Sequence, residues 1–571
     1  MAELMDPELL PRFADEFNRS GHQTAAGKPI VVTPVLVGSA RQVDLLKARI
    51  GRGVALDQTV GDPTIVTPKI DHWLSQLNEE LGQTAVDVQR AQPLAISWLG
   101  IATYREMAEC LGWPNREIGF ADIVALRADP RGWSMCPKAK VEWGMQPMLS
   151  FTDPSSSSTA RSALFALYAI GADKPTDQLT PDDVADPTVQ QYVRTFQSNV
   201  DHYVADTLIL QSKMYQGPRY GHFYVVEENT LVELYQGKLP VTVGAESRPQ
   251  PLTRDMVFLY PKEGSLAHNH PAAVVEAPWV TPDQAEAAQA WIAFLREDAQ
   301  QQSIMSAGFR PATSLPLGDP ISPRFGLNPA GPSRVFPSVS SSAVSAMLES
   351  WQDVKKPGVV TFVVDVSGSM SGAKLEQARK GLTRALDTIS TRNEVGLVTF
   401  NGAIKDRIAV APIASNRFAI GETVGRMQAS GDTALYDALA EGIHMSDAAG
   451  PGAETIRGVV VLTDGRATMG RTRLDQVVHM SSRTERPIVR FDGLGGSSAV
   501  DEDGVGVDER EVVGTGLALR TQHPVHVFFI GLGQDADLEI GRILAEATGS
   551  AYQGVAEKDL AAVVENFGKY F

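Results

Sequence analysis

The 571-residue sequence contains only two cysteines, Cys110 and Cys136, and they have neither CxxC nor zinc-binding spacing. A framework of several disulfides is therefore excluded, and the fold must be stabilised mainly by burial of apolar side chains. Two alternatives stay open for this pair. It forms one disulfide if the protein is exported, or it remains as two buried free thiols.

An excess of positive charge is also absent. The formal net charge is −17, from 51 basic and 68 acidic residues. Nucleic-acid phosphates and anionic membrane surfaces both need a basic partner surface, so this balance argues against either as a ligand. A negative surface is compatible with binding a divalent cation.

Long apolar runs and enzyme motifs are missing as well. The longest uncharged apolar runs, such as 358–364, have the length of a strand and are too short to span a bilayer. The GxSxG, HExxH, P-loop and dinucleotide-binding motifs do not occur, which favours a non-enzymatic protein. Residues 1–18 carry acids where a signal peptide has a basic end and an apolar stretch.

The length predicts two or three domains. Residues 1–316 are assigned to the first domain, because strand-like and helix-like patterns alternate along them. Segments 29–39 and 222–228 are rich in β-branched and aromatic residues, whereas 7–18 and 281–303 have helical apolar spacing. This alternation predicts parallel sheets covered by helices.

The middle of the chain is rich in proline. Residues 315–342 hold six prolines in 28 positions, which indicates a domain boundary. A short helix is predicted at 341–356, and 317–357 is assigned as a proline-rich linker followed by this helix. The remainder, 358–571, is assigned to a second domain.

The second domain is predicted to be a doubly wound α/β sheet. Its four strand-like segments are apolar almost without interruption, as expected of central parallel strands buried on both faces. These segments are 359–364, 394–400, 457–463 and 523–531, with helices predicted at 373–390 and 434–445. The acidic, glycine-rich stretch 490–514 is interpreted as a long surface insertion and not as a calcium site.

A polar motif follows the first predicted strand of this domain. Asp365, Ser367 and Ser369 alternate by two positions in DVSGSM, so their side chains can face one point in an extended loop. Gly368 lets the backbone bend between them. In a doubly wound fold, ligands bind at the carboxyl ends of the central strands, where this loop is expected.

Two later residues belong with this motif. Thr433 lies in SGDTALYDAL just before a predicted helix, and Asp464 follows the predicted strand 457–463. Two carboxylates and three hydroxyls favour Mg²⁺, or alternatively Mn²⁺ or Ca²⁺, over zinc or copper. Because they fill such a site incompletely, they leave a position open for a carboxylate from a protein partner. The set predicts binding and not catalysis.

The segments DVSGSM, SGDTALYDAL and VVVLTDG resemble the three signatures of the von Willebrand factor type A superfamily. The resemblance covers 358–571 and implies that the five polar residues form a metal-ion-dependent adhesion site (MIDAS), with the two aspartates often acting through water. Asp432 departs from the family pattern, in which a glycine usually precedes the threonine. It adds a carboxylate near the site.

In the first domain, residues 150–171 place Thr152, Asp153 and four serines ahead of a predicted helix. Helix N-termini expose unpaired N–H groups, so this loop can hold an anion or a polar solute. The alternative is an N-cap followed by a solvated run of serines. His222 and the His268-Asn269-His270 triplet raise the question of a metal, but a turn before Pro271 is the favoured interpretation.

Five segments of this domain resemble bacterial extracellular solute-binding proteins, in particular those fused to a von Willebrand A domain: LGWPNREIGFADIVAL, TDPSSSS, VVEENTLVELYQG, FLYPKEGSLAHNHPAAVVEAPWV and GFRPA. The resemblance implies two α/β lobes that are joined by crossover strands and close on a ligand like a hinge. It places eight residues in the cleft: Ser39, Ser97, Thr152, Asp153, Ser155, Ser156, Ser157 and Glu227.

Together these patterns predict a binding protein that captures a solute or peptide with its first domain and a protein partner, through a metal, with its second. The alternative is an adhesion or assembly factor that works with an ATPase and uses the first domain as a scaffold without solute. The resemblance implies an extracytoplasmic location. Because solute-binding lobes open with a buried strand and residues 1–6 are a poor strand, we also expect a strand and a signal peptide or anchor upstream of Met1.

Overall fold

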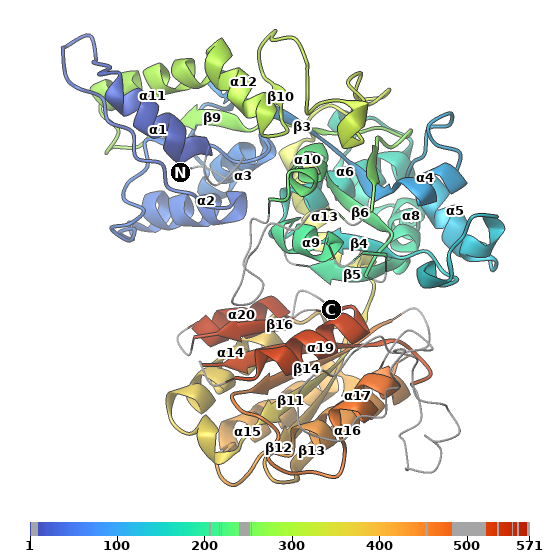
Figure 1. The fold of residues 1–571 in the computed structure, drawn as a ribbon. Coiled ribbons are helices and arrows are strands. Elements are labelled where there is room, and N and C mark those ends of the chain that lie inside the picture. Colours follow the sequence, from blue (N-terminus) through green and yellow to red (C-terminus); the bar gives the residue numbers. More distant parts are fainter. Residues whose placement is uncertain are drawn as a thin grey trace. The chain divides into compact units, whose positions relative to one another are not determined.

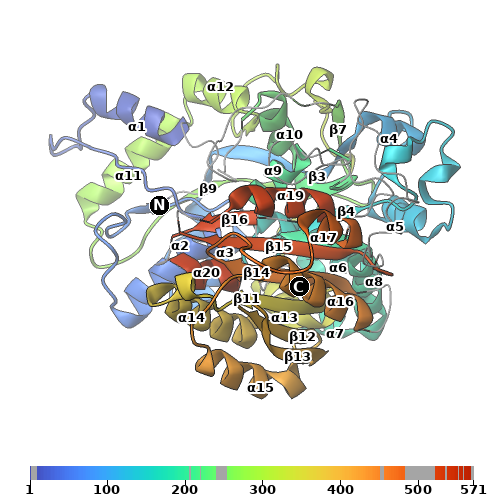
Figure 2. The same cartoon turned by 60° about the horizontal axis from the view of Figure 1, so that its bottom comes forward.

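The computed structural model describes residues 1, 9–204, 207–215, 217, 218, 220–238, 252, 254–450, 455–481, 521–533, 536–550, 552–556 and 559–567. The chain forms two compact units. The first contains most of residues 1–354, and the second contains Lys355–Phe571 together with Asp201–Tyr203. The segment 490–514, interpreted above as an insertion, lies outside the described residues. Figures 1 and 2 show the elements of each unit.

The first unit contains two lobes. The smaller has a three-stranded antiparallel sheet in which β9 (Pro271–Val274) lies between β1 (Ile65–Val66) and β2 (Gln92–Pro93). Its helices are α1 (Leu9–Arg19), α2 (Ser39–Leu46), α3 (His72–Leu81), α11 (Pro282–Leu295) and α12 (Asp298–Ser306). Apolar faces of these helices form two buried clusters, one around Phe17 and Trp291 and one around Trp73 and Leu77.

The larger lobe is built on a seven-stranded sheet of order β10-β3-β6-β4-β5, with β7 and β8 also paired to β3. The strands are β3 (Ala95–Tyr104), β4 (Leu149–Thr152), β5 (Val200–Val204), β6 (Phe223–Glu227), β7 (Met256–Leu259), β8 (Ala267–His268) and β10 (Arg310–Pro311). The helices are α4 (Arg105–Cys110), α5 (Phe120–Ala128), α6 (Ser158–Ala172), α7 (Pro181–Ala185), α8 (Pro187–Ser198), α9 (Thr207–Met214), α10 (Glu228–Tyr235) and α13 (Ser341–Val354).

Two crossover segments connect the lobes. The chain passes from β2 to β3 at Leu94, and from β8 back to β9 through Asn269 and His270. His270 has a positive φ of 41°, which few side-chain-bearing residues adopt. The expected arrangement of two α/β lobes joined by crossover strands is therefore present.

Two expectations for this unit are wrong. The sheets are mainly antiparallel: β3 runs opposite to β6, β7, β8 and β10, whereas β4 runs parallel to β6. Alternation of strands and helices does not fix strand direction when the chain crosses between lobes and returns. Segment 29–39 is not a strand. Segment 281–303 is helical as expected, in two helices separated at Arg296 and Glu297.

The failed strand has an identifiable cause. Pro29 and Pro34 have no N–H to donate to a ladder. Between them, the Val32 backbone exchanges hydrogen bonds of 2.8 and 2.9 Å with the side chain of Asn18 instead of with a neighbouring strand. The expectation of a segment upstream of Met1 stays a prediction.

The two cysteines form a disulfide, Cys110–Cys136, which decides between the alternatives left open by the sequence. The proline-rich segment lies in the first unit, since the units divide between Val354 and Lys355. The predicted helix before that point is α13, which buries Val344, Met347 and Trp351.

The second unit has a six-stranded sheet of order β13-β12-β11-β14-β15-β16. The strands are β11 (Gly358–Asp365), β12 (Glu394–Phe400), β13 (Ile404–Pro412), β14 (Ile456–Thr463), β15 (Val525–Leu532) and β16 (Tyr552–Val555). All four predicted strands are present within one or two residues, and they pair in parallel. The sequence patterns did not indicate the exposed, antiparallel edge strand β13.

Helices cover the sheet of the second unit. They are α14 (Ala373–Thr388), α15 (Ile413–Arg426), α16 (Leu435–Ala448), α17 (Leu474–Ser481), α19 (Leu538–Thr548) and α20 (Leu560–Phe567). Figures 1 and 2 show α14 and α16 on opposite sides of β11. This is the doubly wound arrangement expected from the sequence. Among the described residues, no helix is long and apolar enough to cross a membrane.

Candidate functional site

The first candidate site begins where β11 ends, at Asp365. This side chain is fully buried, whereas we expected it on a surface loop. The backbone N–H of Ser367 donates to Asp365 Oδ1 at 2.7 Å, and the Thr463 hydroxyl donates to Oδ2 at 2.6 Å. The first bond folds the loop back over the strand end, and the second joins the ends of β11 and β14.

A chain of hydrogen bonds links three more of the predicted metal ligands. Ser367 Oγ lies 3.1 Å from Ser369 Oγ, and Ser369 Oγ donates to Asp464 Oδ1 at 2.7 Å. Asp464 directly follows β14, the strand next to β11. Parallel neighbours end at the same sheet edge, which explains why residues almost a hundred positions apart meet here.

The Thr433 hydroxyl reaches the same space from a third loop. The Gly368 N–H donates to the Gly431 carbonyl at 2.9 Å, and this bond joins the two loops. A Cβ built on Gly465 would lie 3.8 Å from Ser369 Oγ and 4.0 Å from Thr433 Oγ1, so both hydroxyls face the space beside Gly465. The adjacent Asp432 is exposed.

The charges at this edge are not balanced. Lys374 Nζ lies 2.5 Å from Asp464 Oδ2 and supplies one positive charge against two carboxylates. Burial raises the pKa of Asp365 above its ordinary value, and the nearby Asp464 charge raises it further against the hydrogen bonds from Thr463 and Ser367. A small hard cation would relieve this repulsion, and the donor set of carboxylate and hydroxyl oxygens suits Mg²⁺. The residues therefore fit the metal that the sequence motif implies.

The second candidate site lies between the lobes of the first unit, around Glu227 at the end of β6. Its carboxylate is buried and accepts from Lys69 Nζ at 3.1 and 3.3 Å and from Thr159 Oγ1 at 2.5 Å. His268 Nδ1 lies 3.0 Å away. Burial alone would raise the pKa of Glu227, but Lys69 and His268 outweigh it and hold this pKa well below its usual range.

A second group of contacts joins the lobes beside Glu227. Trp73 Nε1, on α3, donates to Ser158 Oγ on α6 at 2.9 Å. The Arg161 guanidinium stacks 3.4 Å from the centre of the Trp73 ring and donates to Gln76 Oε1 at 2.6 Å. Burial and the Arg161 charge lower the pKa of His72 well below its ordinary value, which leaves its Nε2 free to accept from Arg161 at 3.0 Å.

The other predicted cleft residues lie in these same loops, and their side chains bond mostly to the protein itself. The Ser39 hydroxyl accepts from the Lys69 N–H at 3.0 Å, and Ser97 donates to Asn229 at 2.7 Å. In the loop before α6, Thr152 bonds to Ser157 and Asp153 accepts from Ser155. Ser156 N–H donates to the Asp153 carbonyl, and Ser157 caps α6.

Comparison with known proteins assigns a family to each of the two domains. Residues 360–566 match the family described as von Willebrand factor type A domain, and residues 58–315 match bacterial extracellular solute-binding protein. The chain joins a solute-binding-protein domain to a von Willebrand A domain. Both are binding families, typically without enzymatic activity.

Curated relatives share only a small part of their length with this chain. Inter-alpha-trypsin inhibitor heavy chain H4 of Sus scrofa is 32% identical over 133 residues, which is 23% of this chain and 14% of that protein. The Homo sapiens protein of the same name is 33% identical over 127 residues, covering 20% and 13%. The match thus spans about one seventh of these relatives.

Solved structures similar to each domain are more distant in sequence. A von Willebrand factor type A protein from Catenulispora acidiphila is 19% identical with a TM-score of 0.26, covering 38% of this chain and 42% of that one. The sulfate-binding protein from Mycobacterium tuberculosis is 18% identical with a TM-score of 0.36, covering 62% and 95%.

Several residues of these sites were missed by sequence reasoning. Thr463 directly precedes Asp464 within the signature VVVLTDG, and Lys374 lies nine positions after Asp365, just beyond DVSGSM. Lys69, Thr159 and Trp73 carried no comparable signal, because they meet Glu227 and α6 only after the lobes of the solute-binding domain come together.

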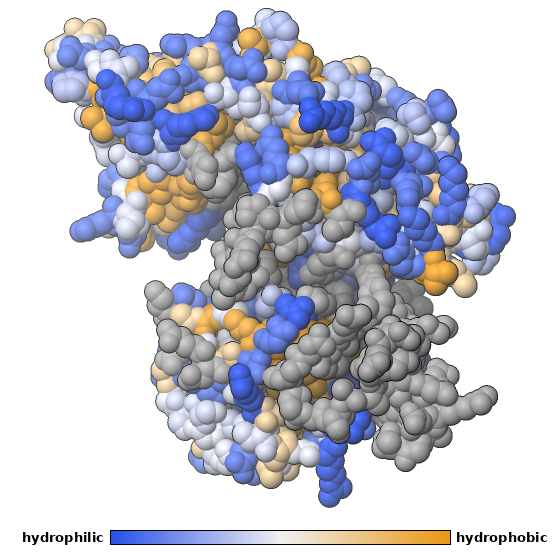
Figure 3. All heavy atoms as spheres, viewed as in Figure 1, coloured by the Kyte–Doolittle hydropathy of each residue, from blue (hydrophilic) through white to orange (hydrophobic). Residues whose placement is uncertain are grey.

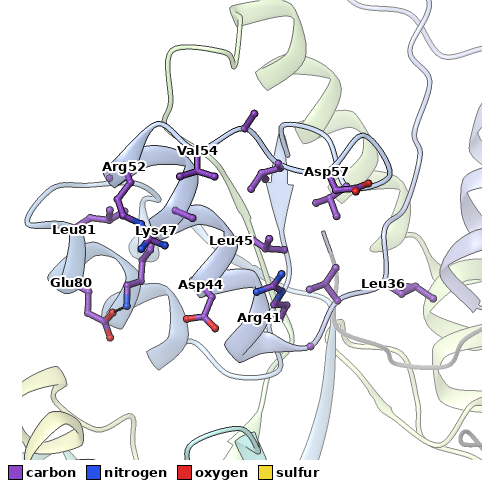
Figure 4. Close-up of a pocket in the computed structure, with 17 residues that line it drawn as sticks. Leu36, Arg41, Asp44, Leu45, Lys47, Arg52, Val54, Asp57, Glu80 and Leu81 are labelled. Atoms are coloured by element: carbon purple, nitrogen blue, oxygen red, sulfur yellow. Dashed lines mark ion pairs between the residues drawn. The ribbon is translucent and has the colours of Figure 1, made fainter. Parts of the chain in front are cut away.

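A pocket in this domain lies elsewhere. It has a volume of about 990 Å³ and is formed in the smaller lobe by α2, the following loop and the end of α3, with Leu45, Val54 and Leu81 facing it (Figure 4). Figure 3 shows apolar surface near α2. None of the eight predicted cleft residues lines it, so it does not mark the expected solute site.

The histidines that raised the question of a metal have other surroundings. His222 Nδ1 accepts from the Trp133 indole at 3.0 Å and from the Met148 N–H at 2.9 Å. His270 is buried against the Phe309 ring. Within the described parts of the chain, no group of three or more His, Cys, Asp or Glu residues is placed to hold a metal.

Proposed function

We propose that this protein is a non-enzymatic binding protein whose von Willebrand A domain engages a protein partner through a divalent cation. The observation that carries the proposal is the linked set Asp365, Ser367, Ser369 and Asp464, with Thr433 facing the same space, at the carboxyl edge of the two central strands. Mg²⁺ is the favoured ion, with Mn²⁺ or Ca²⁺ as alternatives.

These residues would hold the ion in the proposed site. When bound, the cation supplies a positive centre that accepts an acidic side chain of the partner. Asp365 and Asp464 would offset its charge, and Ser367, Ser369 and Thr433 would supply hydroxyl oxygens as further donors. Because the oxygen ligands come from three loops of one rigid sheet, they are held in position before the ion arrives.

We further propose that the first domain captures a small solute or peptide between its lobes, outside the cytoplasm. The disulfide Cys110–Cys136 supports this location, since disulfides persist mainly in oxidising compartments. A second candidate is an adhesion or assembly factor that works with an ATPase, in which this domain is a scaffold without solute. The Lys69–Glu227 ion pair favours it, because protein groups already occupy the cleft.

Two measurements test the proposal on the full chain. Calorimetric titration with Mg²⁺ and Mn²⁺ should give one site per chain, and Ser369→Ala should weaken it, whereas Ser371→Ala, on an exposed hydroxyl of the same loop, should not. Thermal shifts of the first domain against a panel of solutes test capture. A chain that binds no divalent cation would contradict the metal-dependent function, and a panel without any stabilising solute would favour the scaffold.

A further inference from the structure

A lysine from one lobe occupies the acidic centre of the other. Lys69 follows β1 in the smaller lobe, and its backbone N–H is fixed by Ser39 Oγ. Its ammonium crosses to both carboxylate oxygens of Glu227, which ends β6 in the larger lobe. The Glu227 side chain is 1% exposed and that of Lys69 is 13% exposed. The pair is therefore almost completely removed from water.

The larger lobe holds Glu227 ready for a cation. Thr159 Oγ1 bonds to Glu227 Oε1 and to Thr207 Oγ1, and His268 Nδ1 lies 3.0 Å from the same Oε1. A second acid is close by: burial raises the pKa of Glu233 to about 7, and the Lys69 charge opposes that rise. Of Thr159, His268, Glu233 and Lys69, which surround Glu227, Lys69 carries the fixed positive charge, and it comes from the opposite lobe.

A buried carboxylate that loses its cation is strongly unfavourable. Opening the lobes about the crossover at Asn269 and His270 would withdraw Lys69 and let water reach Glu227. When the lobes close again, Glu227 needs a cation, either from Lys69 or from a bound ligand. We propose that Lys69 is an internal stand-in for the ligand, and that the solute captured by this domain carries a primary ammonium group that replaces the Lys69 ammonium on Glu227. This rests on the proposed solute capture.

The surroundings favour an ammonium over other cations. The space now holds an unbranched alkyl chain ending in a compact group with three donors, whereas a guanidinium is planar and wider. The ligand end that reaches Glu227 is therefore predicted to be a single alkyl ammonium arm.

Replacement of the missing side chain in trans tests this inference. Lys69→Ala removes three methylenes and the ammonium, which is n-propylammonium. In the full chain, the melting temperature of the first domain should rise with n-propylammonium concentration in K69A, with an apparent affinity at least about tenfold higher than in wild type, where Lys69 competes. If K69A does not fold, its refolding yield should depend on n-propylammonium and not on sodium or tetramethylammonium.

Matched variants decide the outcome. K69A/E227Q removes the acceptor and should show no response, and Lys174→Ala, which removes a half-exposed lysine of the same domain, should behave as wild type. No response in K69A, or an equal response in K69A/E227Q, would overturn the inference. A neutral or anionic solute that binds wild type and E227Q equally would also overturn it, while leaving solute capture intact. If n-propylammonium raises the melting temperature of K69A but no natural solute is found for wild type, the ammonium site is supported and the proposal of solute capture is contradicted.

Discussion

The two candidate sites handle charge in opposite ways. At the edge of the second unit's sheet, Asp365 and Asp464 face one lysine and remain under-neutralised. In the first unit, Glu227 is matched by Lys69. A rigid sheet can hold like charges together in readiness for a cation, because its strands fix the loops. Two lobes joined by crossovers can instead neutralise a buried carboxylate when they close, because one lobe supplies a cationic side chain to the other.

The strongest test of this contrast is the removal of one metal carboxylate. Asp365→Ala should weaken Mg²⁺ and Mn²⁺ binding by at least roughly 100-fold, since half of the site's negative charge is lost. The fold should stay cooperative, because the lost carboxylate was itself destabilised by burial. Calorimetry and circular dichroism measure the two effects, with Asp387→Ala, which removes an exposed carboxylate of the same unit, as control. An unchanged affinity for Mg²⁺ and Mn²⁺ would contradict the assignment of Asp365 as a metal ligand.

The closed lobes are tested at Arg161. Arg161→Met should destabilise the first unit by about 3 kcal/mol, because it leaves the carbonyl of Pro154 and the side chain of Gln76 without their buried donor. Urea unfolding followed by tryptophan fluorescence measures this, and Arg161→Lys should retain part of the stability. If the methionine variant is as stable as wild type, the Trp73 contact does not hold the lobes together.

Acid should destabilise the first unit through His270. Burial, with the Lys69 charge, lowers the pKa of His270 to about 3, below the unfolded value of about 6.5. The folded state therefore holds the His270 imidazole neutral. Its contribution to the free energy of unfolding is fully present above pH ~6.5 and is lost as the pH falls toward 3. His270→Gln should remove about 3 kcal/mol of the acid destabilisation of the first unit by pH ~4. Thermal unfolding between pH 7 and 4 measures the difference, and an unchanged profile would refute it.

The smallest expected effect concerns Lys374. Lys374→Met removes the cation beside Asp464 and should tighten Mg²⁺ binding about tenfold, because one repelling charge is gone. Lys380→Met, on an exposed position of the same helix, is the control. Weaker binding in Lys374→Met would instead show that the ammonium orients the Asp464 carboxylate.

The sequence predicted the second unit better than the first for a physical reason. Buried parallel strands such as β14 consist of unbroken apolar residues, and the metal residues immediately follow them, so a local pattern located both. The cleft depends on Lys69, Trp73 and Glu227, which lie up to 158 positions apart and meet only through the crossovers. Segment 29–39 has the composition of a strand, but its two prolines and the Asn18 contacts exclude it from a sheet.

The position of β11 has a mechanical consequence. The chain enters the second unit at Lys355 and passes directly into β11, whose far end carries Asp365. A partner held at that end would pull along the strand axis, against seven residue pairs with β12 and seven with β14. Hydrogen bonds on both sides would then be loaded in shear together and not peeled one at a time. Tension between the partner and the first unit would thus be carried by a central strand that is paired on both sides.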